Sequence, residues 1–291
     1  MLTPGLRIGD YELLRYIATG AMSDVYEGRR SDGGPSVALK VMHEDLCAHA
    51  DLLTRFHNEA RALEALRNAR LITLFAWGIL PEGPPYMVLE WLPHSLEQVL
   101  TRAGGSVLAP VAARVGAQIG EALAALHDSG VIHRDVKPAN VLLADEDLSR
   151  AEMKLADLGL CKVFREGAAG AGLEKAAVIP VFPLSTGGSD LLGTWEYMAP
   201  EQWIQSKTAG PKADVYSLGV LLFQMVAGRL PFTAEEQREW MAFHVLRSPP
   251  LDLLEGRASP PLRTLIARML SKKAAERPTM RESAEELAAL Q

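Results

Sequence analysis

Residues 131–143 combine two short apolar runs with polar side chains whose types suit phosphate chemistry. The stretch reads Val-Ile-His-Arg-Asp-Val-Lys-Pro-Ala-Asn-Val-Leu-Leu, so a charged loop lies between two segments that we expect to be short buried strands. Charged groups this close to a core are costly to bury unpaired. The spacing suits Asp135 as a general base, Lys137 as a phosphate partner and Asn140 as a metal ligand. A plain polar turn would not require these three residue types at these positions.

A further oxygen ligand follows soon after this loop. Residues 153–156 are expected to form a short strand that leads into Asp157, Leu158 and Gly159. Taken alone, an aspartate at a strand end can simply make an Asx-turn. Mg²⁺, however, takes few protein oxygens and shares its remaining positions with phosphate and water. Asn140 and Asp157 therefore form a reasonable pair of metal ligands.

Two segments near the N-terminus could lie against a nucleotide. Residues 11–26 are predicted to form a hairpin whose turn, Thr19 to Asp24, has small side chains that let backbone N–H groups approach phosphate oxygens. Residues 37–41 are predicted to form a strand in which Ala38 and Lys40 share a face. A small residue can then lie under an adenine while the lysine points at phosphates. A plain β-turn and an exposed lysine remain the alternatives.

The elements expected to position these residues are a small sheet and one helix. Residues 51–67 carry apolar side chains at helical spacing, and Glu59 borders that stripe. Glu59 is either a solvated flank residue or the ion-pair partner of Lys40, and we favour the ion pair. Two further strands are predicted at 71–79 and 86–91, whereas residues 1–10 are expected to be an irregular lead.

The rest of the chain is predicted to be mostly helical. Residues 110–128 carry a long apolar stripe, and residues 214–227 are apolar on nearly every side, which indicates a buried central helix. Asp214 stands at its start, where a carboxylate can cap free N–H groups. Two more helices are expected at 260–270 and 279–290, the second beginning with the capping-box sequence Thr-Met-Arg-Glu. The long segment 163–192 is rich in small residues, and such a loop is rarely kept without a function.

Composition limits the class of protein. The chain has 291 residues, of which 48% are hydrophobic and 23% charged, as expected for a soluble globular protein. A net charge of −6 without Lys/Arg clusters argues against a nucleic-acid partner. Two cysteines suit a reducing compartment, the first residues do not resemble a signal peptide, and the apolar run 218–227 is too short to span a bilayer. We therefore expect a cytoplasmic protein with no membrane segment.

In this order, the motifs resemble those of eukaryotic-type Ser/Thr protein kinases, with a bacterial character in residues 21–25. The resemblance covers roughly residues 11–285 and includes the closing motif Gly-Thr-Trp-Glu-Tyr-Met-Ala-Pro-Glu at 193–201. It implies an α+β, bilobal protein-kinase-like fold with ATP in the cleft, a small, mostly-β N-lobe with one key helix, and a larger, mostly-α C-lobe. The implied division is a lead at 1–10, an N-lobe at 11–91, a hinge at 92–95 and a C-lobe at 96–291, with the activation segment at 157–201.

The resemblance also implies a role for individual residues, with ATP and Mg²⁺ (or Mn²⁺) as cofactors. Lys40 would hold the α- and β-phosphates with Glu59 as its partner. Asp135 would deprotonate the substrate hydroxyl, Lys137 would neutralise the transferring phosphate, and the hydroxyl of Thr194 would bridge them. The metal would bind Asn140 and Asp157. Further nucleotide contacts would come from Ala18, Gly20, Ser23, Val25, Ala38, Leu89, Glu90, Leu92 and Leu142.

Acceptor type, regulation and partners follow from the same resemblance. Lys137 and Thr194 indicate serine or threonine acceptors in a protein substrate. Arg134 beside the base implies activation by a phosphate on the activation segment, which would come from a second copy of the chain acting in trans. The candidate phosphorylation sites are Ser185, Thr186 and Ser189. Two further pairings are implied: Glu201 with Arg277, and a packed column of Leu63, Leu74, His133 and Leu158.

The sequence departs from the family in the glycine-rich loop, where only the middle glycine, Gly20, is present. Ala18 and Ser23 replace the other two glycines. This departure supports an alternative, a catalytically weak pseudokinase that acts as a nucleotide-binding scaffold, although the base, the lysine and the metal ligands argue against it. A small-molecule kinase would generally lack Lys137-Pro138 and the 193–201 motif. A module without chemistry would show no ATP-dependent thermal shift.

Overall fold

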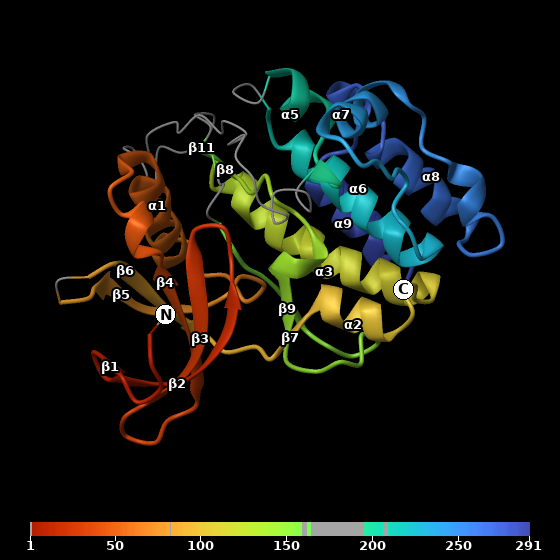
Figure 1. Cartoon of the computed structure of the whole chain (residues 1–291). Helices are drawn as coiled ribbons and strands as arrows, with labels where there is room; N and C mark the ends of the chain where they lie inside the picture. Colours follow the sequence, from red (N-terminus) through yellow and green to blue (C-terminus); the bar gives the residue numbers. More distant parts are fainter. Residues whose placement is uncertain (1, 82, 159–161, 164–194, 206–208) are drawn as a thin grey trace. The chain divides into compact units, whose positions relative to one another are not determined.

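The computed structural model describes residues 2–81, 83–158, 162–163 (backbone only), 195–205 and 209–291. The chain divides into two compact units (Figure 1). Unit 1 comprises Met1–Arg67 and Leu71–Pro93, and unit 2 comprises Asn68–Arg70 and His94–Gln291. The short segment 68–70 thus belongs with the larger unit.

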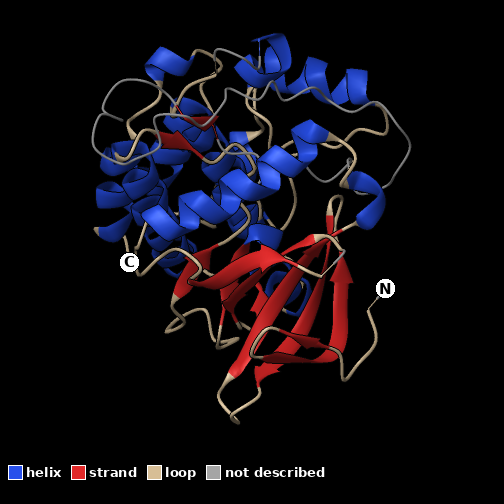
Figure 2. Cartoon of the chain, turned by 90° about the vertical axis from the view of Figure 1, so that its left-hand side faces the viewer, coloured by secondary structure: helices blue, strands red, loops and turns tan. Residues whose placement is uncertain are grey.

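Unit 1 is built on an antiparallel sheet with the strand order β1-β2-β3-β4-β6-β5, drawn in red in Figure 2. Its core is formed by apolar side chains that alternate along the strands, among them Leu13, Tyr26 and Leu39. The expected irregular lead is wrong in one respect, since it contains the edge strand β1. The strands are β1 (Arg7–Ile8), β2 (Tyr11–Thr19), β3 (Ser23–Arg30), β4 (Ser36–Met42), β5 (Leu74–Ile79) and β6 (Pro85–Glu90).

One α-helix, α1 (Ala50–Ala65), accompanies the described part of this sheet and follows the 3₁₀ turn η1 (Glu44–Leu46). The predicted helix at 51–67 is therefore confirmed, with its ends one to two residues earlier. Its buried face carries Phe56, Ala60 and Leu63 at the expected helical spacing. Glu59 lies on the same buried face, which places a carboxylate inside unit 1.

Unit 2 is organised around α6 (Lys212–Ala227), whose residues are buried on almost every side as the sequence predicts (Figure 1). Helix α3 (Ala109–Asp128) packs against both α6 and α9. Helices α3 and α9 approach closely at Gly120, since a Cβ on this residue would lie only 2.9 Å from the Cβ of Ala284. The other helices are α2 (Leu96–Arg102), α5 (Pro200–Gln205), α7 (Gln237–Leu246), α8 (Pro260–Met269), α9 (Met280–Ala288), η5 (Leu251–Leu254) and η6 (Ala274–Glu276).

Short strands frame the charged loop in unit 2. Strand β8 (Val131–Ile132) precedes it and pairs with β11 (Lys162–Val163). The turn η2 (Pro138–Asn140) and strand β9 (Val141–Leu143) follow it, and β9 pairs with both β10 (Met153–Leu155) and β7 (His94–Ser95). The two buried strands predicted around the loop are thereby confirmed. Strand β7 lies inside the segment expected to be a linker, and Ser95 caps α2 with a capping box.

The starts of helices α9 and α3 follow from their local sequence. The capping box at the start of α9 is present, since the Thr279 side chain accepts from the Glu282 N–H and the Glu282 side chain reaches back to Thr279. Helix α3 begins with Pro110 in its first turn, where the missing N–H is not needed. Over the residues that the structure describes, we find no helix with both the length and the apolar content needed to cross a membrane.

Candidate active site

Lys40 and Glu59 form a buried ion pair within unit 1. The Lys40 Nζ atom lies 2.8 Å from both carboxylate oxygens of Glu59. The side chain of Glu59 is only 1% exposed and that of Lys40 is 11% exposed. A solvated position for Glu59 is therefore wrong, and the predicted ion pair is confirmed. Because one partner fixes the other, the ammonium group of Lys40 has a defined position on β4.

Neighbouring strands of the sheet bring several predicted nucleotide-binding residues together. Val25 on β3 pairs with both Ala18 on β2 and Lys40 on β4, and Ala38 pairs with Leu89 on β6. Gly20 and Ser23 lie at the β2–β3 turn. Glu90 and Leu92 belong to the same unit, whereas Leu142 belongs to unit 2. Their contacts with a nucleotide stay predictions.

In unit 2 the charged loop is held by its own histidine. The Nδ1 atom of His133 accepts from the Asp135 N–H at 3.2 Å, and Nε2 lies 3.1 Å from the carbonyl oxygen of Ala156. This pattern requires the proton on Nε2, so His133 is a donor to one side and an acceptor to the other. Arg134 adopts a φ of 71°, a left-handed conformation that non-glycine residues rarely adopt. The loop thereby turns sharply immediately before Asp135.

The carboxylate of Asp135 is oriented through one of its two oxygens. Its Oδ2 atom accepts from the Asn140 Nδ2 at 2.9 Å and lies 2.9 Å from the Lys137 Nζ. Asn140 also donates to the Asp135 backbone oxygen at 2.8 Å. Among the described residues, these bonds engage Oδ2 and leave Oδ1 as the oxygen able to accept a proton. Asp135 is nearly buried, at 8% exposure, so that few water molecules compete for it.

Lys137 is kept charged by the acids around it. Burial disfavours its ammonium form, but Asp135, Asp157 and Glu97 outweigh burial and raise the pKa of Lys137 above its ordinary value. The side chain remains 21% exposed. Lys137 thus holds a positive charge next to the carboxylate of Asp135, an arrangement able to neutralise a negatively charged group such as phosphate.

Asn140 and Asp157 fit the role of metal ligands. Since Nδ2 of Asn140 is committed to Asp135, the amide oxygen of Asn140 faces away from that contact and is suited to a hard cation. The Asn140 backbone oxygen accepts from the Ala156 N–H at 2.8 Å, which sets Asn140 beside the residue that precedes Asp157. Asp157 has a φ of 62°. One amide and one carboxylate oxygen suit Mg²⁺, which keeps most of its shell for water and phosphate.

Asp214 has a different role from the one that the sequence suggested. It lies in the first turn of α6, but its carboxylate accepts from the charged loop: Oδ2 from the His133 N–H at 2.9 Å and Oδ1 from the Arg134 N–H at 2.8 Å. His127, near the end of α3, also lies 2.7 Å from Oδ2. The expectation that the Asp214 carboxylate caps the N–H groups of its own helix is therefore wrong. The signal available in the sequence was an acid within an otherwise apolar helix.

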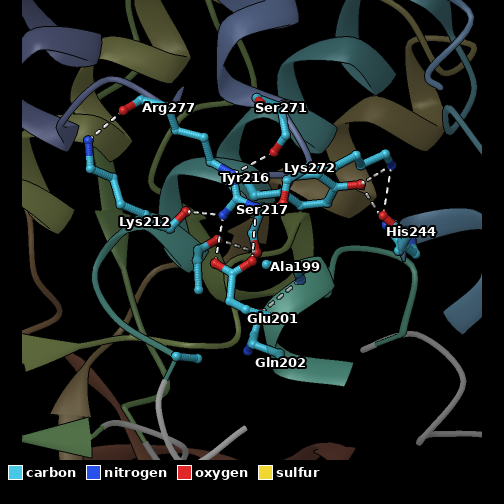
Figure 3. Close-up of polar contacts among 12 residues, drawn as sticks. Ala199, Glu201, Gln202, Lys212, Tyr216, Ser217, His244, Ser271, Lys272 and Arg277 are labelled. Carbon is cyan, nitrogen blue, oxygen red and sulfur yellow. Dashed lines mark hydrogen bonds and ion pairs between the residues drawn. The ribbon is translucent and has the colours of Figure 1, made fainter. Parts of the chain in front are cut away.

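A second ion pair joins the segment after residue 195 to the helical core. The guanidinium of Arg277 contacts both carboxylate oxygens of Glu201, at 2.6 and 2.8 Å, as the sequence predicts. Figure 3 shows Glu201 pointing at Arg277 between Lys212 and Tyr216. The side chain of Arg277 is fully buried and also donates to the carbonyl oxygens of Lys212 and Ser271, at 2.8 Å each.

We expect Glu201→Ala to lower the free energy of unfolding by about 3 kcal/mol, because it leaves the Arg277 charge buried without its counter-ion. This value is the lower end of the range of about 3–5 kcal/mol for breaking a buried ion pair, because backbone carbonyl groups still contact Arg277. The matched control is Glu286→Ala, which removes an exposed pair in which one guanidinium nitrogen of Arg268 contacts both carboxylate oxygens, and it should cost less than about 1 kcal/mol. Urea titrations measure both; equal losses would contradict the argument.

Several predicted residues lie outside the described part of the chain, or in different units. Thr194, Ser185, Thr186 and Ser189 belong to the first group. Arg134, their expected phosphate partner, is 6% exposed and donates to the Ala209 carbonyl oxygen at 3.4 Å. In the proposed column, Leu63 and Leu74 belong to unit 1, and His133 and Leu158 to unit 2. The column therefore stays a prediction.

These two units, with a lysine–glutamate pair in one and an aspartate–lysine–asparagine loop in the other, have the features of a protein kinase. The family model of the protein kinase domain matches residues 11–287, so the chain belongs to the protein kinase family. The α+β bilobal fold predicted from the sequence is thereby confirmed: the small lobe is mostly β and the large lobe mostly helical.

The chain is similar to serine/threonine-protein kinases of bacteria. It is 34% identical to Pkn1 of Myxococcus xanthus over 277 residues, which cover 94% of this chain and 37% of that protein. It is 35% identical to pkn2 of the same organism over 299 residues, covering 99% and 33%. It is 36% identical to PknL of Mycobacterium tuberculosis over 221 residues, covering 75% and 49%. The chain thus spans about a third to a half of these relatives.

Proposed function

We propose that this chain is an active protein kinase that transfers the γ-phosphate of ATP to serine or threonine hydroxyls of a protein substrate. The observation that carries the proposal is the arrangement around Asp135. One carboxylate oxygen is held by Asn140 and Lys137, and the other has no hydrogen-bond or ion-pair contact within the described part of the chain and would accept the proton. A base that is nearly buried, oriented and next to a fixed cation suits phosphoryl transfer, which depends mostly on positioning and on stabilising charge.

The reaction assigned to these residues is a single displacement at phosphorus. The substrate hydroxyl oxygen bonds to the γ-phosphorus as the bond to the β–γ bridging oxygen breaks, and ADP leaves. Asp135 takes the hydroxyl proton on Oδ1, while Lys137 compensates negative charge on the phosphoryl oxygens. In unit 1, Lys40 would hold the α- and β-phosphates at a position set by Glu59. Mg²⁺ or Mn²⁺ on Asn140 and Asp157 would neutralise the phosphate charge.

The scaffold alternative has little support in the site. A pseudokinase commonly loses the groups that hold phosphate or accept the proton, whereas the Lys40–Glu59 pair and the Asp135 arrangement are complete in the described residues. The altered glycine-rich loop is the remaining argument for it. No residue of the turn at 19–24 has a positive φ, so the turn does not require the two missing glycines, and this weakens that argument.

The test is transfer of labelled γ-phosphate to the protein itself and to a mixed protein substrate in the presence of Mg²⁺. We expect labelled phosphoserine or phosphothreonine after hydrolysis, and at least about 100-fold less label in reactions with Asp135→Asn. ATP-dependent thermal stabilisation without any transfer would favour the scaffold. Transfer to tyrosine alone would overturn the assignment of the acceptor.

A further inference from the structure

The turn between β2 and β3, which we call the lid, comprises residues 19–24. Its ends are paired, since Thr19 lies opposite Asp24 in the ladder, and the Gly20 N–H donates to the Ser23 carbonyl oxygen at 2.8 Å. All of these residues are described, and none has a positive φ. A Cβ on Gly20 would come no closer than 3.4 Å to the Ser23 oxygen. The lid is therefore unstrained although it lacks two of the family's glycines. Its position is then decided by contacts with residues outside 19–24.

A cluster of three side chains holds the base of the lid. The Nε2 atom of His43 lies 3.1 Å from Asp24 Oδ1 and 3.2 Å from Thr19 Oγ1. With its proton on Nε2, His43 donates to Asp24, and the Thr19 hydroxyl can donate to the same carboxylate. The other oxygen of Asp24 accepts from the Tyr26 hydroxyl at 3.2 Å. Both ends of the lid are thus joined to one histidine.

His43 also holds the lid through its backbone. Its N–H donates to the Met22 carbonyl oxygen, near the tip of the lid, at 2.9 Å. His43 directly follows β4, the strand that carries Lys40. The strands β2, β3 and β4 lie side by side in unit 1 (Figure 1). The lid is therefore fixed, by a backbone bond and by a side-chain cluster, to the strand whose lysine is assigned to phosphate.

The cluster also stabilises the negative charge of Asp24, which lies at a turn expected to bind phosphate. An acid at a phosphate-binding turn carries the same sign of charge as its ligand. Burial works against the ionised form of Asp24, but Thr19, His43 and Tyr26 outweigh it and lower the pKa of Asp24. The carboxylate thus stays ionised, with its oxygens engaged by neighbouring donors.

We propose that Thr19, Asp24 and His43, which we name the lid clamp, position the lid relative to Lys40 and thereby set the affinity of the kinase for the phosphates of ATP. His43 is a positioning residue in this proposal and touches no reacting atom. The inference rests on the proposed function, because it needs a nucleotide under the lid. The clamp holds the lid in its binding position before ATP arrives, whereas the two missing glycines would have left the lid adaptable.

The experiment compares two ligands, Mg-ATP and adenosine, in the wild type and His43→Ala by calorimetry. Adenosine has no phosphates, so that the lid should not affect its binding. We expect the Kd of Mg-ATP to rise about 3- to 10-fold, the range that the net value of one hydrogen bond supports, while the Kd of adenosine stays unchanged. In steady-state assays, KM for ATP should rise in parallel with little change in kcat.

Three further variants separate positioning from general damage. His43→Gln retains an N–H donor at a similar reach and should restore most of the ATP affinity. Thr19→Val removes one hydroxyl and should give a smaller loss than His43→Ala. Ser36→Ala is the matched control, because it removes a hydroxyl that donates to a carboxylate, Glu27, at 2.9 Å, at the other end of β4. It should leave both Kd values unchanged.

Hydrogen exchange gives an independent readout without nucleotide. The amides of residues 20–23 should exchange faster in His43→Ala than in the wild type, with no change in α1. The proposal is overturned if Mg-ATP affinity is unchanged, if adenosine weakens equally, or if exchange in the lid is unaltered. If wild-type protein binds ATP but transfers no phosphate, the proposed function fails while the comparison of ligands still decides the clamp.

Discussion

Replacing Asp135 by asparagine is expected to lower kcat about 10²- to 10⁴-fold, the usual contribution of a general base. The substitution keeps the shape of the side chain and an oxygen that Asn140 and Lys137 can contact. It removes the oxygen that accepts the substrate proton and the negative charge facing Lys137. Since the loss concerns proton transfer rather than the fold of unit 1, ATP affinity should change little. Single-turnover phosphorylation and ATP titration measure the two effects separately.

A matched control for this substitution is Asp145→Asn. Asp145 belongs to the same unit, also pairs with a basic residue, Arg150, and its side chain is 44% exposed. Its loss should leave kcat unchanged, because a surface pair contributes little. If Asp135→Asn kept more than about a tenth of wild-type kcat, the assignment of Asp135 as the base would be contradicted. If Asp135→Asn lost ATP binding as well as kcat, Asp135 would instead have a structural role.

The features that could be predicted from sequence are those decided by neighbours in the chain. The lid hairpin and the capping box of α9 each depend on residues within six positions of one another. The apolar character of α6 likewise identifies a central helix without knowledge of its partners. The Lys40–Glu59 pair joins residues 19 positions apart, and it was predicted because the motifs around it fit a known family.

The features that could not be predicted depend on distant partners or on very short elements. Asp214 is bonded to residues 80 and 81 positions earlier in the chain, so that local capping was the simpler explanation. Strand β1 has two residues, too few to show any alternation. The lid clamp joins three ordinary polar residues through a histidine that no motif marks. Each of these three features can be recognised only once the folded structure shows which distant residues are neighbours.

Asp214→Asn is expected to cost about 3–5 kcal/mol of unfolding free energy and to lower kcat strongly. The carboxylate is fully buried and accepts bonds from two backbone N–H groups and from His127. An asparagine supplies one acceptor oxygen and turns an NH₂ group toward another donor, and breaking buried charge-assisted contacts has this magnitude. Both N–H groups belong to the residues immediately before Asp135, so the base should lose its position. Thermal denaturation and kcat together measure the effect.

The dependence of this loss on pH distinguishes the carboxylate from a packing effect. Burial alone would raise the pKa of Asp214, but the hydrogen bond and charge of His127 and the hydrogen bond from the Arg134 N–H outweigh it and lower the pKa. A carboxyl whose folded pKa lies below its unfolded value of about 3.9 stabilises the fold fully above that value. Its contribution disappears as the pH falls through the folded pKa. The difference in stability between wild type and Asp214→Asn should therefore be constant near neutrality and shrink below about pH 4. A difference that stayed constant into the acid range would mean that shape, rather than ionisation, is what Asp214 supplies to the catalytic loop.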